Sequence, residues 1–188
     1  MPSYKALFKT FKMKPTFLPL ITLLLLAFAS CDMADNDSPD DIEDTYAATM
    51  IQPGEAAPSF TLATPDGRSI SLGDYSGQYL VLDFWASWCP DCQQAMPKLG
   101  AIYGQYNDKA AFLGISFDKD RAALLTAIAT YAIRYPQVSE YKEEWKQTDI
   151  YTLYNIRWIP SFYVVSPEGI VALATTNLDK LADFLARL

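Results

Sequence analysis

The chain has 188 residues, with 22 acidic and 15 basic side chains, three cysteines and no histidine. Without histidine there can be no serine–histidine or cysteine–histidine dyad, no histidine-ligated haem and no zinc site with mixed cysteine and histidine ligands. The net charge of −7 argues against nucleic-acid binding, which needs lysine and arginine at the phosphates, and the 51% hydrophobic content argues against a chain that is disordered throughout.

Residues 1–30 have the pattern of a bacterial signal peptide. An apolar run of about 13 residues spans positions 17–29, too short for a bilayer, which takes about 20 residues. The run ends in Phe28-Ala29-Ser30-Cys31, which resembles a lipobox, and this resemblance implies cleavage before Cys31 and lipid attachment to it. An ordinary signal peptide beside an incidental cysteine is the alternative. The charged start of the segment has four basic residues: Lys5, Lys9, Lys12 and Lys14.

Residues 31–52 are predicted to form an acidic flexible tether. The stretch 32–44 holds seven acidic residues and no basic one, and loss of the four leader lysines takes the net charge from −7 to −11. Such a run repels itself and extends, which would hold a folded domain away from a membrane. The predicted location is the periplasm-facing cell envelope, where disulfides persist. The inner membrane, the outer membrane and the cell surface all stay open as the site of the anchor.

The predicted folded domain covers residues 53–188. Alternating residues at 59–62 and 69–72 flank a Pro-Asp-Gly turn and predict a β-hairpin. Buried strands are then expected at 79–85 and 111–117, with helices at 90–106 and 121–131. The chain is expected to close with strands at 161–166 and 170–174 and an amphipathic helix at 178–188.

This order of elements predicts an α/β fold. A strand–helix–strand unit implies a parallel pair with a right-handed crossover, and the last two strands add antiparallel pairs. We therefore expect a mixed central sheet flanked by helices, with an N-terminal β-hairpin extension.

The segment Cys89-Pro90-Asp91-Cys92 carries the chemistry of the chain. It lies where a buried strand turns into a helix, and Trp88 precedes it with a large flat apolar surface. The free N–H groups and partial positive charge of a helix N-terminus stabilise a thiolate, so Cys89 should have a lowered pKa and be nucleophilic near neutral pH. A purely structural disulfide is the alternative.

These residues resemble the active site of the thioredoxin superfamily. The entry Gly54…Ala57-Pro58-Ser59-Phe60 is similar to the TlpA/ResA-like branch of thiol:disulfide oxidoreductase lipoproteins. Trp158-Ile159-Pro160-Ser161-Phe162 matches the cis-proline loop of the superfamily, and Pro97 matches its kinking proline. The resemblance covers about residues 53–188 and implies a thioredoxin-like fold.

The resemblance implies a role for each matched residue. Cys89 would attack a partner's disulfide or thiol, and Cys92 would be the buried resolving cysteine. Asp83 occupies the position of a buried carboxylate, where burial should raise its pKa and let it take and return the proton of Cys92, unless it is a vestigial acid. Substrate-binding positions are predicted along the exposed rim and the proline loop: Trp88, Pro90, Asp91, Ile159 and Pro160. Pro160, if cis rather than trans, would bring the Ile159 backbone beside the cysteines for pairing with an extended substrate.

Two departures from the ResA pattern place the expected site closer to that of a plain thioredoxin than to those of the specialised cytochrome-maturation members. Many ResA-like proteins carry a glutamate shortly after the second cysteine, where this chain has Gln93-Gln94-Ala95-Met96, and many have asparagine at the position of Asp83. The negative charge of Asp91 should destabilise the Cys89 thiolate by repulsion. Weaker stabilisation of the thiolate makes a disulfide less oxidising, which favours a reductase or isomerase over an oxidase.

The predicted function is an envelope thiol:disulfide oxidoreductase that exchanges a Cys89–Cys92 disulfide with protein thiols. Its predicted partners are protein thiols and disulfides, a membrane or periplasmic thiol electron donor, and a membrane through the lipid anchor, with no nucleic acid. No cofactor besides the redox-active disulfide and no metal is expected. The alternatives are a peroxiredoxin-like thiol peroxidase, although no threonine of the required Pro-x-x-x-Thr-x-x-Cys pattern precedes Cys89, and a redox-inactive thioredoxin-fold binding module.

Overall fold

The computed structural model describes residues 45–188. The predicted signal peptide, the lipid-attachment residue Cys31 and the acidic run up to Asp44 lie outside the described residues. Within residues 45–188, no helix is long and apolar enough to cross a membrane.

A mixed sheet of seven strands organises the described part, in the order β2-β1-β5-β4-β3-β6-β7. β3 pairs in parallel with β4, and β4 with β5, whereas the β3–β6, β6–β7 and β1–β2 pairs are antiparallel. The predicted mixed sheet with an N-terminal hairpin is therefore confirmed. The strands are β1 (Thr61–Ala63), β2 (Ser69–Ser71), β3 (Tyr79–Trp85), β4 (Ala110–Ser116), β5 (Gln137–Ser139), β6 (Ser161–Val165) and β7 (Val171–Thr175).

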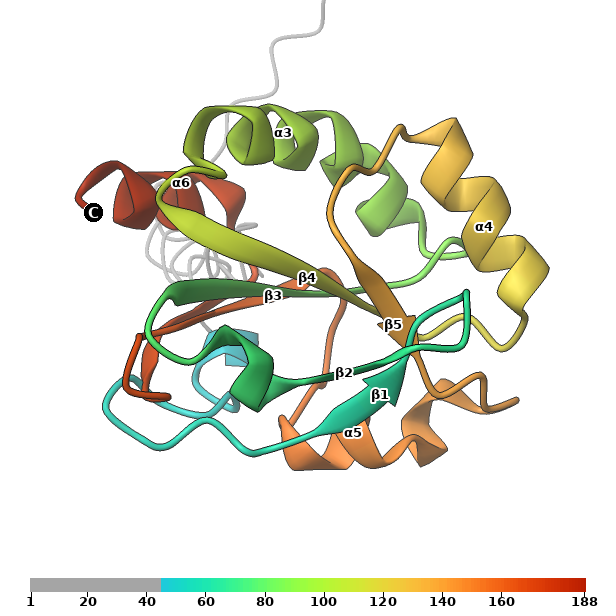
Figure 1. Cartoon of the computed structure of the whole chain (residues 1–188), viewed down its shortest axis with the longest axis horizontal. Coiled ribbons are helices and arrows are strands. Elements are labelled where there is room, and N and C mark those ends of the chain that lie inside the picture. The colour runs from blue at the N-terminus through green and yellow to red at the C-terminus, as the bar shows by residue number, and fades with distance from the viewer. Residues whose placement is uncertain (1–44) are drawn as a thin grey trace, which may run out of the picture. The chain divides into compact units, whose positions relative to one another are not determined.

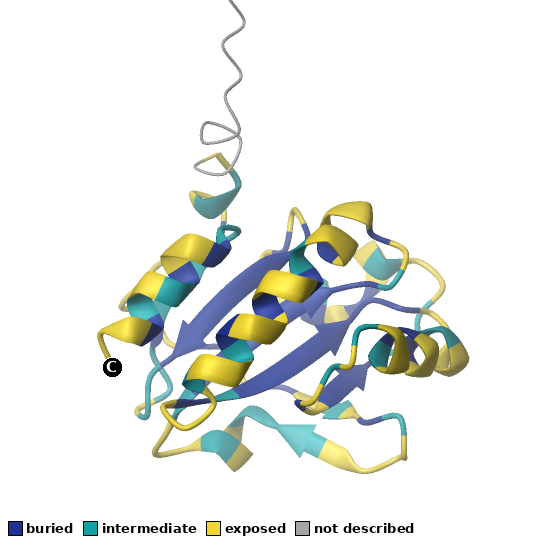
Figure 2. Cartoon of the chain, turned by 90° about the horizontal axis from the view of Figure 1, so that it is seen from above, coloured by how far each residue is buried: buried dark blue, intermediate teal, exposed yellow. Residues whose placement is uncertain are grey.

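Helices cover both faces of this sheet. In Figure 1, α3, α4 and α6 lie above the sheet and α5 lies below it. Seen from above in Figure 2, the helices present buried residues toward the sheet and exposed residues to solvent, as their apolar spacing requires. The helical segments are η3 (Leu72–Tyr75), α3 (Pro90–Tyr106), α4 (Arg121–Thr130), η4 (Trp145–Gln147), α5 (Asp149–Leu153) and α6 (Leu178–Ala186).

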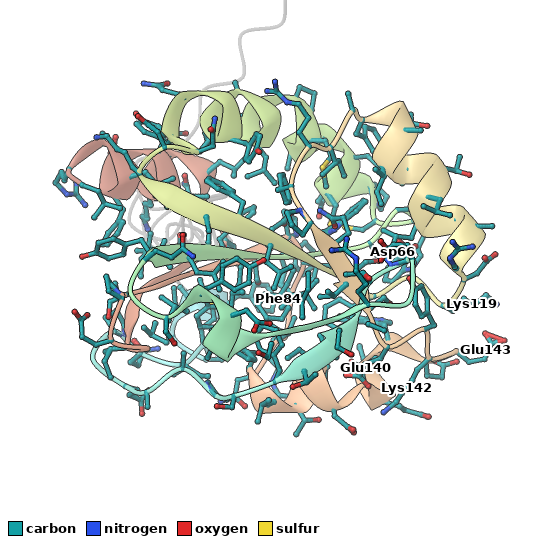
Figure 3. All side chains as sticks on the ribbon, in the orientation of Figure 1. Asp66, Phe84, Lys119, Glu140, Lys142 and Glu143 are labelled. Carbon is teal, nitrogen blue, oxygen red and sulfur yellow. The ribbon has the colours of Figure 1, made fainter. Side chains whose placement is uncertain are left out.

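Strand β3 is the central element that positions the site. All of its residues after Tyr79 are buried, because helices or other strands cover it on both sides. On one face Phe84 contacts the rings of Phe117, Tyr154 and Tyr163, with centroids between 5.2 and 6.2 Å away, and it lies near the middle of the molecule in Figure 3. This aromatic cluster fixes the end of β3 from which the active-site loop departs.

Three short elements between residues 137 and 153 were absent from the prediction: β5, η4 and α5. β5 spans only three residues, all buried, so it shows no alternation, and α5 spans five residues, too few for a helical period. β3 and α3 begin and end at the predicted residues, while β4 starts one residue earlier and α6 ends two residues earlier than expected.

The segment 45–52, which we expected to belong to the flexible tether, instead packs against the domain. The Tyr46 ring stacks on Trp158 at 5.1 Å, Met50 is 5% exposed, and the Ile51 N–H donates to the Tyr163 hydroxyl at 3.1 Å. The acidic run ends at Asp44, and the next ten residues carry no charge, so burial of their apolar side chains is favourable. The folded domain therefore begins before residue 53.

Gly114 allows close packing beside the site. It pairs with Asp83 of β3 and with Gln137 of β5, and a Cβ there would overlap the Gln137 side-chain amide, which accepts a hydrogen bond from Trp85 Nε1 at 2.9 Å. Gly114→Ala is expected to lower the free energy of unfolding by about 1–3 kcal/mol, measured by urea denaturation. Gly100→Ala, on an exposed helix position with no atom within 4 Å of the added Cβ, is the matched control and should stabilise slightly. Wild-type stability for Gly114→Ala would show that the amide moves at no cost.

Candidate active site

Cys89 is the N-cap residue of α3. Its backbone is extended, with φ −83° and ψ 116°, and Pro90 follows at the first helical position, where a missing N–H costs nothing. The Cys89 sulfur accepts a hydrogen bond from the Cys92 N–H at 3.2 Å, as an N-cap side chain does. The predicted placement of this cysteine at the junction of a strand and a helix is what the structure shows.

The two cysteines are free thiols with opposite acidities. Hydrogen bonds from the Cys92 thiol and backbone lower the pKa of Cys89 to about 7, against the opposing effects of its own burial and of the Asp91 charge. Burial, above all, raises the pKa of Cys92. At neutral pH Cys89 is therefore substantially a thiolate while Cys92 keeps its proton.

Asp83 is fully buried on β3. Its Oδ2 accepts a hydrogen bond from the Tyr135 hydroxyl at 2.7 Å, while Oδ1 has no hydrogen-bond partner. Burial raises the pKa of Asp83 to about 7, although the Tyr135 hydrogen bond opposes this shift. The Asp83 charge in turn contributes to the raised pKa of Cys92, so the carboxylate and the thiol influence each other's protons.

The loop before β6 reaches the cysteines from the other side. The Ile159–Pro160 peptide bond is cis, both residues are buried, and the Cys89 thiol lies 3.5 Å from the Ile159 carbonyl oxygen in a weak hydrogen bond. The predicted cis-proline loop is thus adjacent to Cys89. It brings a main-chain acceptor within reach of the Cys89 sulfur.

Exposed aromatic side chains surround the buried cysteines. Trp88 is 49% exposed and Trp158 is 39% exposed, while Pro90 and Asp91 are exposed at the start of α3. The Trp88 ring contacts Trp145 of η4 at 5.9 Å. Among the residues predicted for substrate binding, Trp88, Pro90 and Asp91 are therefore exposed, whereas Ile159 and Pro160 are buried.

Sequence reasoning missed Asp118. Its carboxylate accepts hydrogen bonds from the Ser87 N–H and hydroxyl, the latter at 2.6 Å, and from the Ser116 hydroxyl at 2.8 Å. These bonds fix the loop that carries Trp88 and Cys89. An acidic residue directly after a buried parallel strand was the available signal. Tyr135 had no such signal, because its contact with Asp83 depends on the position of the loop before β5.

None of the described residues forms a cluster of three or more potential metal ligands.

A mixed sheet with helices on both faces, a CxxC pair at the start of α3 and a facing cis-proline define a thioredoxin-like protein. Residues 53–174 match the model of the AhpC/TSA family, and the chain belongs to this family. The predicted fold and the predicted class of thiol:disulfide oxidoreductase are both confirmed at the level of the family.

Known relatives carry matching names. The chain is 32% identical over 124 residues to the thioredoxin-like protein YneN of Bacillus subtilis, covering 64% of this chain and 69% of that protein. It is 30% identical over 141 residues to the thiol-disulfide oxidoreductase ResA of Oceanobacillus iheyensis, covering 70% of each. The thioredoxin domain of a thiol-disulfide oxidoreductase from Bacteroides vulgatus is similar in structure, with a TM-score of 0.66 and 27% identity over 73% of this chain and 97% of that one.

Proposed function

We propose that the chain is an envelope thiol:disulfide oxidoreductase that reduces or isomerises disulfides in proteins. The observation that carries this proposal is the pair of free thiols at the start of α3, where Cys89 has a lowered pKa and Cys92 a raised one. Cys89 can attack a disulfide as a thiolate, whereas Cys92 stays protonated until the resolving step.

The first step is attack by the Cys89 thiolate on one sulfur of a partner disulfide. The partner's S–S bond breaks, a mixed disulfide with Cys89 forms, and the second partner sulfur leaves as a thiolate. Cys92 then gives its proton to Asp83, and its sulfur attacks the Cys89 sulfur. This closes the Cys89–Cys92 disulfide and releases the partner with two reduced sulfurs.

Two electrons leave the protein in each cycle, so an envelope thiol donor must return them. No other cofactor enters the proposed reaction. The partner disulfide would lie against Trp88, Pro90 and Asp91, and its main chain would pair with the backbone next to Pro160, as in addition of a strand.

The acidity of Cys89 supports the reducing direction. Stabilising the thiolate stabilises the reduced form, and thiols of strongly oxidising relatives have pKa values of about 3.5, against about 7 in thioredoxin. The Cys89 pKa of about 7 resembles the thioredoxin value, and the charge of Asp91 helps to keep it there.

The proposed anchor rests on the sequence before the described part. The leader and the lipobox ending at Cys31 support cleavage, lipidation and attachment to a membrane of the envelope. Mass spectrometry of the membrane-extracted protein should show a chain that begins at a lipid-modified Cys31, and an unmodified Cys31 would exclude the anchor.

The alternative functions gain no support from the geometry. The Cys89 sulfur is held by Cys92 and faces the Ile159 carbonyl, rather than the threonine and arginine of a peroxidase. A binding scaffold has no need for two neighbouring thiols of opposite acidity.

A turnover assay tests the proposal. With dithiothreitol as donor, the protein should accelerate the reduction of insulin disulfides, and Cys89→Ser should abolish this acceleration. No acceleration by the wild-type protein would refute the proposed function.

A further inference from the structure

A proton that Asp83 accepts from Cys92 needs a route to solvent, because the carboxyl group is fully buried. Its neighbours on the sheet offer none: β4 places Gly114 opposite it, and β6 places Phe162 there. The hydroxyl group that contacts the carboxylate belongs to Tyr135, whose oxygen lies 2.7 Å from Oδ2.

Tyr135 also lines a cavity of about 370 Å³. The opposite wall is α3, where Pro97 and Gly100 supply little or no side chain, and a Cβ added at Gly100 would meet no atom within 4 Å. The cavity has polar groups and room for several water molecules. Tyr135 therefore both borders this cavity and contacts Asp83 through its hydroxyl.

We propose that Tyr135 and this cavity form the route by which the proton of Cys92 leaves the protein, an inference that rests on the proposed exchange function. Tyr135 is a positioning residue: its hydroxyl occupies Oδ2 and leaves Oδ1 open to the proton. The S–H bond of Cys92 breaks, an O–H bond forms on Asp83, and the sulfur keeps the electron pair. The carboxyl group then turns its O–H toward Tyr135, and the proton moves onto the hydroxyl oxygen while the hydroxyl hydrogen passes to a water molecule in the cavity. Tyr135 ends neutral beside an Asp83 carboxylate.

Few titratable or charged groups face Asp83 and Tyr135. From α3, Cys92 and Tyr103 do so, the Tyr103 ring lying 5.2 Å from the Tyr135 ring. From the loop before β5, the Arg134 guanidinium lies 5.4 Å above the Tyr103 ring. α6 contributes apolar residues to this core: Leu178, Leu181, Ala182, Phe184 and Leu185. Burial raises the pKa of Tyr135 well above its ordinary value, so its hydroxyl keeps its proton and remains a donor.

The Cys92 step can be isolated with Ellman's reagent on the reduced full-length chain carrying Cys31→Ser, which leaves only Cys89 and Cys92 as thiols. Cys89 displaces one coloured thiolate when it forms the mixed disulfide, and Cys92 displaces the second when it closes the ring. Stopped-flow absorbance separates the two phases. The first phase serves as an internal control, because it requires only Cys89.

Tyr135→Phe keeps the ring and removes the hydroxyl. The lost hydrogen bond held the Asp83 pKa down. The pH at which the rate of the second phase is half-maximal should therefore rise by about one unit, and the second phase should slow about tenfold at pH 6. The first phase should be unchanged. A second phase with wild-type rate and midpoint would overturn the proposal, whereas absence of a second phase in the wild-type protein would refute the exchange function itself.

Gly100→Phe tests the cavity independently and leaves the Asp83 hydrogen bond in place. It should slow the second phase at every pH without moving the midpoint, because the ring fills the space next to Tyr135. Ala101→Phe is the matched control on the exposed side of α3, and its second phase should match the wild type. An unchanged second phase in Gly100→Phe would show that the proton leaves elsewhere.

Discussion

Replacing Cys92 with serine is expected to convert exchange into capture. Cys89 keeps the backbone N–H of residue 92 as a hydrogen-bond donor and keeps its place at the helix N-terminus, so it still forms the mixed disulfide. The resolving thiol is gone, so the partner stays bound. Turnover in the insulin assay should fall by about 10³-fold or more, because the cycle cannot close.

The captured species is measurable directly. One equivalent of a disulfide-containing peptide should add its mass to Cys92→Ser and be released by dithiothreitol. With Cys31 replaced by serine in both variants, Cys89→Ser should capture nothing, because Cys92 is fully buried and its pKa is raised. Equal capture by both variants would mean that the assignment of nucleophile and resolving thiol is wrong.

Asp83→Asn is expected to stabilise the protein at alkaline pH while slowing the resolving step. The folded-state pKa of about 7 lies above the ordinary 3.8, so the folded protein binds more protons than the unfolded chain between about pH 4 and pH 7. Stability therefore falls as the pH rises through this window and stays reduced above it. A difference of about three units corresponds to about 4 kcal/mol.

Urea denaturation at two pH values checks this expectation. Asp83→Asn should match the wild type at pH 4 and exceed its free energy of unfolding by several kcal/mol at pH 8, since asparagine still accepts from the Tyr135 hydroxyl. Asp108→Asn, at an exposed position, is the control and should show no such difference. A gain for Asp83→Asn that is the same at both pH values would contradict the raised pKa.

Local signals in the sequence were sufficient for the elements that carry the two cysteines. An apolar run predicts β3, and the proline after Cys89 with apolar residues every three or four positions predicts α3. The cis-proline loop could be predicted only through the family resemblance, because a single proline in a loop does not reveal its neighbours.

The supporting contacts depend on the tertiary structure. Tyr135 meets Asp83 across 52 positions of the chain, and Ser87 meets Asp118 across 31. Trp145 reaches Trp88 from a three-residue turn of helix. β5, η4 and α5 have too few residues to show a period, so their presence could not be predicted from the sequence.

The reduction potential of the Cys89–Cys92 pair tests the proposed function most directly. Equilibrating the protein with dithiol buffers and alkylating the free thiols should give one two-electron transition close to the thioredoxin value of about −270 mV. A transition near −120 mV, the value of a strong oxidant, would contradict the reducing direction, and the absence of any transition would contradict a redox-active pair.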